Sequence, residues 1–286
     1  MIRASDVAAR LGLKRYPRSW RGRCPCCDYA GSTLSVRTAR DGRAQLYCAN
    51  GCDRVDLTAA VAKAIGQPSS ASQVEVDAAA SRERRRERAL SLWCGSEPAT
   101  GTLADRYLTA RGLSGLAASP SLRFRADCPH PEGGRLPALM ALVQDVTGQP
   151  IAVHRTFLAR DGTKACVEPA KASLGRIWGT SIRLHPPKAE LPLVIGEGIE
   201  TAATAGRLMG FPAWAAISAG NLAKGLVLPP EVCRVVIAAD PDNAGQNAAR
   251  DAWLRWNADG RSVQIATPDG SGDFNDLLRG WEAAHG

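Results

Sequence analysis

The sequence lacks the long apolar run that a membrane-spanning segment requires. Its longest stretch without a charged residue lies between Arg207 and Lys224, and glycine and proline residues interrupt it. A membrane-spanning helix needs about 20 consecutive apolar residues. Near the N-terminus, Arg3, Asp6 and Arg10 occupy the region where a secretion signal would carry its apolar stretch. We therefore expect a soluble cytoplasmic protein.

Two other features are missing, and each excludes a class of protein. No Gly-x-x-x-x-Gly-Lys-Ser/Thr loop occurs in the 286 residues, which excludes a P-loop ATPase within them. No repeat is visible, which excludes a solenoid. Hydrophobic residues make up 45% and charged residues 22% of the chain, near the averages of globular proteins. The length allows about two domains.

What the chain does have is a cluster of cysteines. Its nine cysteines are an odd number without an export signal, which argues against a disulfide framework and favours metal binding or buried thiols. Five of them lie between residues 24 and 52. We expect the other four to be ordinary buried or half-buried thiols; they are Cys94, Cys128, Cys166 and Cys233.

Within the cluster, Cys24 pairs with Cys27 and Cys48 with Cys52, at the spacing of two zinc knuckles. Residues 33–38 and 44–47 are predicted strands of a hairpin that turns at Arg40–Gly42, which is the arrangement of a zinc ribbon. Cys26 is left as a spare thiol. Four thiolates leave no open position on the ion, so we predict one structural Zn²⁺. The alternative is five unrelated structural cysteines.

Charge is distributed unevenly along the chain. Residues 1–66 carry a net charge of +7, residues 67–190 carry +5 and residues 191–286 carry −4. A basic region of this size favours a polyanionic partner such as nucleic acid. Around the cysteines, basic residues are mixed with Trp20 and Tyr47, a combination that suits single-stranded nucleic acid. The alternatives are a basic surface without a partner and aromatic rings that pack under the ribbon.

The acidic last third predicts a parallel sheet. Apolar strands at residues 191–195, 213–217, 232–239 and 262–267 alternate with helices at 199–209 and 246–258. Acidic residues follow three of the strands: Glu197, then Asp240 and Asp242, then Asp273 and Asp276. Ligand sites in such sheets lie beyond the carboxyl ends of the strands. Clustered carboxylates suit Mg²⁺ or Mn²⁺, although each acid taken alone could simply cap a helix.

These motifs carry a family resemblance. Gly196-Glu197-Gly198 after its apolar strand and Asp240-Pro-Asp242-Asn-Ala-Gly245 resemble the Toprim domain of bacterial primases, topoisomerases and some nucleases. The ending Gly272-Asp273-Phe-Asn-Asp276 is similar to the third acidic motif of phage and plasmid primases. A four-cysteine ribbon ahead of a Toprim domain resembles the arrangement of DnaG-type primases across nearly the whole chain.

The resemblance implies a DNA primase that makes short primers on single-stranded DNA from nucleoside triphosphates, in the cytoplasm and in the replication of a plasmid, phage or other mobile element. It implies that Glu197, Asp240 and Asp242 are catalytic and bind Mg²⁺ or Mn²⁺ together with Asp273 and Asp276. The DNA- and nucleotide-binding candidates are Arg21, Arg23, Arg37, Arg155, Lys164, Lys171 and Arg176. A replicative helicase would have to be a separate chain.

The predicted organisation has four parts. It consists of a zinc-ribbon DNA-binding domain over residues 1–66, a linker over 67–80, a basic mixed α+β subdomain over 81–190, and an α/β Toprim catalytic domain over 191–286 with helices on both faces of its sheet. Two alternatives stay open, a Toprim-type nuclease and a non-catalytic DNA-binding accessory protein. A topoisomerase is disfavoured because all four tyrosines lie in the first 107 residues.

Overall fold

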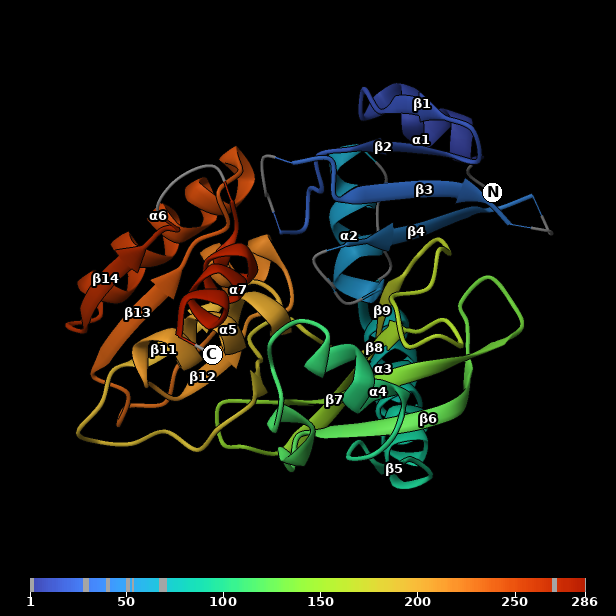
Figure 1. Ribbon diagram of the computed structural model, residues 1–286. Coiled ribbons are helices and arrows are strands. Elements are labelled where there is room, and N and C mark those ends of the chain that lie inside the picture. Colours follow the sequence, from blue (N-terminus) through green and yellow to red (C-terminus); the bar gives the residue numbers. More distant parts are fainter. Residues whose placement is uncertain are drawn as a thin grey trace. The chain divides into compact units, whose positions relative to one another are not determined.

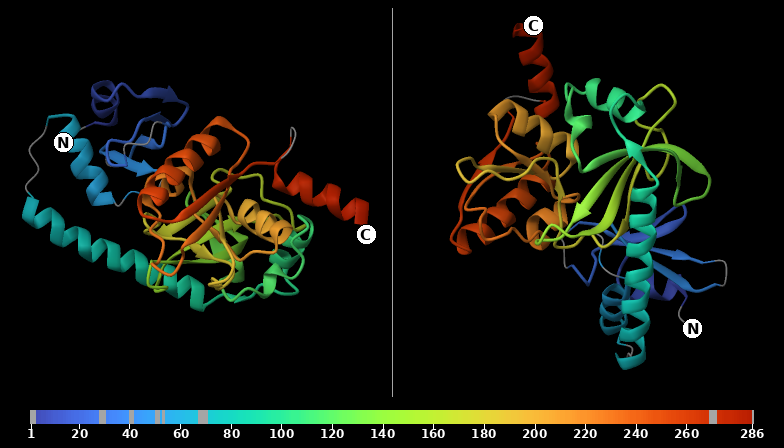
Figure 2. Two further views of the ribbon diagram at one scale, coloured as in Figure 1. Left: turned by 90° about the vertical axis from the view of Figure 1, so that its left-hand side faces the viewer. Right: turned by 90° about the horizontal axis from the view of Figure 1, so that it is seen from below.

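The structure is a computed structural model that describes residues 3–27, 31–39, 42–49, 52, 54–66, 71–268 and 272–285 (Figures 1 and 2). It divides into two compact units, Met1–Arg85 and Arg86–Gly286, which we describe separately.

The first unit is built on a small antiparallel sheet. Its strands lie in the order β1-β2-β3-β4, and its elements are α1 (Ala4–Arg10), β1 (Lys14–Tyr16), β2 (Ser19–Gly22), β3 (Leu34–Thr38), β4 (Ala44–Cys48) and α2 (Arg54–Ala64). Strands β3 and β4 confirm the predicted hairpin, and Arg40 and Asp41 of its turn lie outside the described residues. Leu34 and Val36 are fully buried.

Helix α3 (Ala71–Cys94) runs across the limit between the two units. Residues 71–80 of the predicted linker over 67–80 form the start of this helix, whereas 67–70 lie outside the described residues. The physical reason is composition. From residue 71 onward the segment is rich in alanine, arginine and glutamate, which favour helix more strongly than the preceding Gly-Pro-Ser composition opposes it.

The second unit contains two five-stranded sheets. The central sheet is antiparallel in the order β5-β6-β7-β8-β9. Its elements are β5 (Glu97–Pro98), α4 (Leu103–Thr109), the 3-10 turn η1 (Leu116–Ala118), β6 (Leu122–Pro129), β7 (Arg135–Gln144), β8 (Pro150–Phe157) and β9 (Lys171–Gly175).

The other sheet has the order β10-β12-β11-β13-β14, and all of its strands are parallel except β10. Its elements are β10 (Ile182–Arg183), β11 (Leu193–Gly196), α5 (Ile199–Met209), β12 (Ala213–Ala215), the π-helical turn η2 (Asn221–Gly225), β13 (Arg234–Ala238), α6 (Asn243–Ala258), β14 (Ser262–Ala266) and α7 (Phe274–His285). Helices α5 and α7 pack on one face and α6 on the other, as predicted.

The two sheets of this unit share one hydrophobic core. Strand β7 alternates its side chains, so that Met140 packs with Trp93 of α3 while Leu139 and Ala141 face the opposite way. The core that Leu139 and Ala141 enter also contains Val194 of β11 and Ala202 of α5. The sheets are therefore joined through this shared core, while each also packs a second core on its other face. No helix among the described residues is long and apolar enough to cross a membrane.

Candidate active site and metal centre

The four predicted zinc ligands come together in the first unit. Cys24 and Cys27 lie in the turn after β2, Cys48 ends β4, and Cys52 follows it. All four Sγ atoms lie within 4.8 Å of one another, with 3.9 Å between Cys24 and Cys52 and 3.8 Å between Cys27 and Cys48. Tetrahedral Zn–S bonds of about 2.3 Å place the sulfurs about 3.8 Å apart. The cluster therefore fits a structural zinc ion.

The donor chemistry of this cluster also fits a cation. Without an ion, contact with the Cys24 sulfur is the main cause that raises the pKa of the Cys48 and Cys52 thiols. Thiolates this close together would repel one another. A cation bound between them would relieve that repulsion and favour the thiolate form. Cys26 is half-buried and lies outside the group of four. Of the four scattered cysteines, only Cys128 is buried, and the expectation was wrong for Cys94, Cys166 and Cys233, which are exposed.

Beside the cluster, the β1–β2 hairpin stacks cations on aromatic rings. The Arg15 guanidinium lies 4.1 Å from the centre of the Trp20 ring, and that of Arg21 lies 5.1 Å from the Tyr16 ring. Tyr47 is 60% exposed, so it does not pack under the ribbon. Of the other residues predicted to contact DNA in this unit, Arg23 is exposed and Arg37 is half-buried. The strand register places Arg21, Tyr16, Arg37 and Tyr47 on one face of the sheet, which is therefore basic and aromatic, whereas Arg15 and Trp20 lie on the other face.

In the second unit, the carboxyl ends of β11 and β13 lie at one edge of the sheet. Gly196 is in register with Ala238, so Glu197 and Asp240 follow neighbouring strands. Burial, followed by the charge of Asp240, raises the pKa of Glu197 from 4.5 to about 7. The pKa of Asp240 is also raised, mainly by burial. Two half-buried carboxylates that oppose each other's ionisation fit a site for a divalent cation.

Asp242 and the last two predicted acids make local contacts at helix ends. Asp242 caps α6, because its Oδ1 accepts a hydrogen bond from the Gly245 amide at 2.7 Å. Asp273 and Asp276 each accept a hydrogen bond from the other's backbone amide at the start of α7, at 2.9 and 3.1 Å. This is the capping alternative that the sequence left open. The charges of Asp242 and Asp273 still contribute to the raised pKa of Asp240.

Glycine at position 245 permits the close approach of α6 to this edge. A Cβ at Gly245 would lie 2.8 Å from the Cβ and the carbonyl oxygen of Asp240. The packing of the helix start against Asp240 is therefore the physical reason for glycine here. The Thr201 hydroxyl on α5 donates a 2.9 Å hydrogen bond to Asp240 Oδ1, which fixes the carboxylate from the other side.

Glu197 and Asp240 line a cavity of about 200 Å³. The ionisable side chains that complete its lining are His154 of β8, Lys171 of β9 and Glu200 of α5. Burial, reinforced by the charge of Lys171, lowers the pKa of His154 to about 3, so this ring is neutral. The cavity thus contains a single ammonium group, that of Lys171, among the carboxylates of Glu197, Glu200 and Asp240.

Glu200 is a residue of this site that the sequence reasoning missed. It is 7% exposed. It accepts hydrogen bonds from the Tyr107 hydroxyl at 2.5 Å and from Lys171 Nζ at 2.9 and 3.0 Å. Burial alone would raise the pKa of Glu200, but the charge of Lys171 and the hydrogen bonds outweigh it and lower the pKa to about 2. The available signal was an acid on the apolar face of the 199–209 helix.

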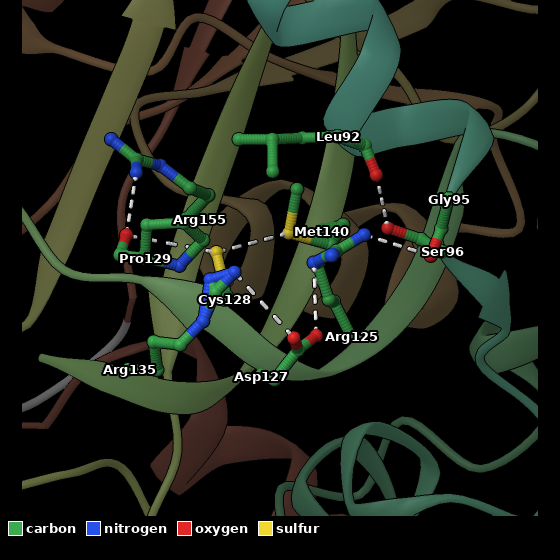
Figure 3. A network of polar contacts seen from close by, with 10 residues as sticks. All are labelled: Leu92, Gly95, Ser96, Arg125, Asp127, Cys128, Pro129, Arg135, Met140 and Arg155. Carbon is green, nitrogen blue, oxygen red and sulfur yellow. Dashed lines mark hydrogen bonds and ion pairs between the residues drawn. The ribbon is translucent and has the colours of Figure 1, made fainter.

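The predicted cations of the middle region occupy different environments. Lys171 lines the cavity, whereas Lys164 and Arg176 are exposed and do not line it. Arg155 is 6% exposed, and its guanidinium donates to the carbonyl oxygens of Pro129 and Ala172 at 2.9 and 3.3 Å. Figure 3 shows it in a polar network. Burial and these two internal hydrogen bonds argue against Arg155 as a direct DNA contact.

The same network ties the long strand β6 to its surroundings. Arg125 forms an ion pair with Asp127 at 3.2 Å and donates to the Gly95 carbonyl oxygen at 2.8 Å (Figure 3). The Cys128 thiol contacts the Met140 sulfur at 3.8 Å. These contacts connect α3 to β6 and β7 on the face away from the cavity, so the network is structural.

Comparisons with known proteins extend this picture. Residues 192–282 match the Toprim domain family, and residues 83–184 match a family described only as a domain of unknown function, DUF7146. No match was found among curated proteins. Residues 192–282 are thus a Toprim domain, which confirms the sequence prediction for this part of the chain. A four-cysteine cluster lies ahead of it, as the resemblance implied.

Solved structures of primases are similar to the chain at a distance. The zinc-binding and RNA polymerase domains of Aquifex aeolicus primase are 15% identical over 98% of this chain and 80% of that one, with a TM-score of 0.46. The primase fragment of the bacteriophage T7 primase-helicase protein is 11% identical over 92% and 96%, with a TM-score of 0.42. A DnaG catalytic domain bound to single-stranded DNA is 16% identical over 71% and 81%, with a TM-score of 0.48. Likeness at this level assigns no activity.

Proposed function

We propose that this protein is a DNA primase that synthesises short primers on single-stranded DNA by divalent-metal-dependent nucleotidyl transfer. The observation that carries the proposal is the cavity that Glu197, Asp240 and Lys171 line together at the edge of a Toprim sheet. It is supported by the four-cysteine cluster and the basic, aromatic surface on the same chain.

In this proposal, Glu197 and Asp240 hold Mg²⁺ or Mn²⁺, and Asp242 and Asp273 add negative charge near it. When bound, the ion neutralises phosphate charge and lowers the pKa of an attacking hydroxyl group. Glu197 must lose its proton to bind the ion, because its pKa without metal is about 7. The Thr201 hydroxyl keeps Asp240 oriented toward the cavity.

The rest of the chain would supply binding. Lys171 meets a phosphate group in the cavity that it lines with Glu197 and Asp240. Arg21, Arg23 and Arg37 contact the template backbone, and Tyr47 stacks on a base. The cysteine cluster holds one structural Zn²⁺. The division into a ribbon, a subdomain over 81–190 and a catalytic domain over 191–286 is part of the proposal, as are a separate helicase partner and a role in a mobile element.

Incorporation of labelled nucleotides on single-stranded DNA with Mg²⁺ or Mn²⁺ tests this function. Short oligomers made by the wild type and absent from Asp240→Asn would establish the primase. A shortened template in place of new oligomers would identify a nuclease. A template that is bound but otherwise unchanged would identify a DNA-binding accessory protein.

A further inference from the structure

Glu200 connects three elements that are far apart in the sequence. It lies in the first turn of α5, Tyr107 lies on α4 and Lys171 begins β9. All three belong to the second unit. The Glu200 carboxylate accepts from Tyr107 at 2.5 Å and from Lys171 through both of its oxygens, at 3.0 and 2.9 Å. Both oxygens are therefore occupied by protein donors.

The two partners of the ion pair differ in exposure. The Glu200 side chain is 9% exposed, whereas that of Lys171 is 36% exposed. Lys171 lines the cavity together with Glu197 and Asp240. A lysine ammonium carries three N–H donors, and Glu200 offers only two acceptor oxygens. The arrangement therefore leaves donor capacity on the ammonium group, which belongs to the same cavity lining as Glu197 and Asp240.

The contact with Glu200 preorganises the Lys171 side chain for binding. A lysine side chain has a flexible four-carbon stem and loses rotamer freedom when it binds a ligand. Glu200 holds the ammonium group through two oxygens, and the Tyr107 hydroxyl in turn holds the Glu200 carboxylate. Much of that freedom is therefore already lost before a ligand arrives, which favours binding.

We propose that Glu200 and Tyr107 are positioning residues that hold Lys171 for a phosphate group bound beside Glu197 and Asp240. The inference rests on the proposed function, which supplies phosphate ligands of two kinds, a nucleoside triphosphate and the phosphodiester backbone of DNA. Glu200 itself does not touch the ligand. It acts through Lys171, and Tyr107 acts through Glu200.

A purely structural role would give a different pattern, and helix α5 offers a matched control. The Thr204 hydroxyl donates a 2.8 Å buried hydrogen bond to Asn275 Oδ1 of α7. Thr204 is fully buried and lies one turn further along the same helix than Glu200. Thr204→Val removes a buried polar contact of α5 without touching the cavity, so it measures what loss of helix anchoring alone does to binding.

The test is calorimetric titration of Mg²⁺–ATP and, separately, of a single-stranded oligonucleotide into the full chain, with thermal unfolding of each variant. Charge-assisted hydrogen bonds predict that Lys171→Met weakens phosphate binding about 30-fold, Glu200→Gln about 10-fold and Tyr107→Phe about 3-fold. Glu200→Gln combined with Lys171→Met should bind as Lys171→Met does, because Glu200 acts only through the lysine. Thr204→Val should lower the melting temperature and leave both affinities within about twofold.

The pattern of results separates this inference from the proposed function. Losses confined to Mg²⁺–ATP would assign the phosphate to the nucleotide, and losses confined to the oligonucleotide would assign it to the DNA backbone; either supports the inference. A wild type that makes primers while Glu200→Gln binds both probes normally would overturn the inference alone. So would a double variant weaker than Lys171→Met, since Glu200 would then act by structure. A wild type that binds neither probe would overturn the inference and the primase together.

Discussion

The cysteine cluster and the acidic edge of the Toprim sheet each bring together side chains that repel one another when they are ionised. The side chains lie much closer together in the cysteine cluster than at the acidic edge. The four Sγ atoms lie within 4.8 Å of one another, and among the described residues no set of three or more acidic side chains comes as close. At the acidic edge, Glu197 and Asp240 share the cavity while Asp242, Asp273 and Asp276 cap helices. A closed ligand set suits a structural ion, and an open one leaves room for a substrate.

The largest expected effect concerns the cysteine cluster, whose four thiols form a closed ligand set. Cys48→Ser combined with Cys52→Ser should abolish zinc binding and unfold the first unit, because structural zinc contributes about 10–16 kcal/mol to the folding of such small domains. Metal analysis and circular dichroism measure this. Cys26→Ser should keep one zinc per chain, since Cys26 lies outside the group of four. Zinc retained in the double variant would show that Cys48 and Cys52 do not hold the ion and that the chain has no zinc ribbon.

The acidic edge of the Toprim sheet should matter less for folding than the cysteine cluster does, and it should be decisive for catalysis. Asp240→Asn keeps an oxygen for the Thr201 hydrogen bond but loses a charge, so nucleotide incorporation with Mg²⁺ should fall about 1,000-fold while DNA binding persists. The matched control is Asp251→Asn on the exposed side of α6, which should incorporate nucleotides normally. Undiminished synthesis by Asp240→Asn would exclude this edge from the mechanism.

The raised pKa of Glu197 predicts a pH dependence of stability in protein without added Mg²⁺. Because the folded state binds the proton more tightly, the contribution of Glu197 to stability is fully present below about pH 4.5 and is lost as the pH rises to about 7, a decrease of about 3 kcal/mol. Denaturant titrations across this range measure it. Glu197→Gln should flatten the decrease, and Glu231→Gln, an exposed substitution, should not. An unchanged slope in Glu197→Gln would show that another group is responsible.

The smallest effects concern the basic surface. Replacing Arg21, Arg23 and Arg37 by alanine should make the salt dependence of single-stranded DNA binding shallower by about 2 in the log–log slope, since each phosphate contact contributes about 0.7. Tyr47→Ala should weaken binding about tenfold at every salt concentration, because stacking does not release counterions. Fluorescence anisotropy at several salt concentrations separates the two effects. A flat salt response in the wild type would contradict the basic interface.

Local patterns were sufficient to predict much of this structure. The apolar spacing of residues 199–209 predicted the bounds of α5, and the cysteine spacing predicted the whole cluster. The alternation within β8 also contained a signal that was not used. Arg155 shares a face with Val153 and Phe157, which pack against α3, so its burial follows from its register in the strand.

What the sequence did not reveal depends on distant pairing. Strand β9 forms because residues 171–175 pair with β8, a contact that no local pattern encodes. Glu200 is buried because Tyr107, 93 residues earlier, and Lys171 supply its partners. The roles of Asp273 and Asp276 were ambiguous for a related reason, since an acid at a helix start serves equally as a cap or as a ligand until its neighbours are known.

The common core of the two sheets in the second unit has a consequence for the history of the protein. Leu139 and Ala141 of the central sheet pack in the same core as Val194 and Ala202 of the Toprim sheet, although two separate families match these halves. Neither half could be replaced by the corresponding domain of another protein without compensating substitutions in the shared core. The two halves are therefore expected to be inherited as one piece, and the Toprim half expressed alone should aggregate through its uncovered apolar face.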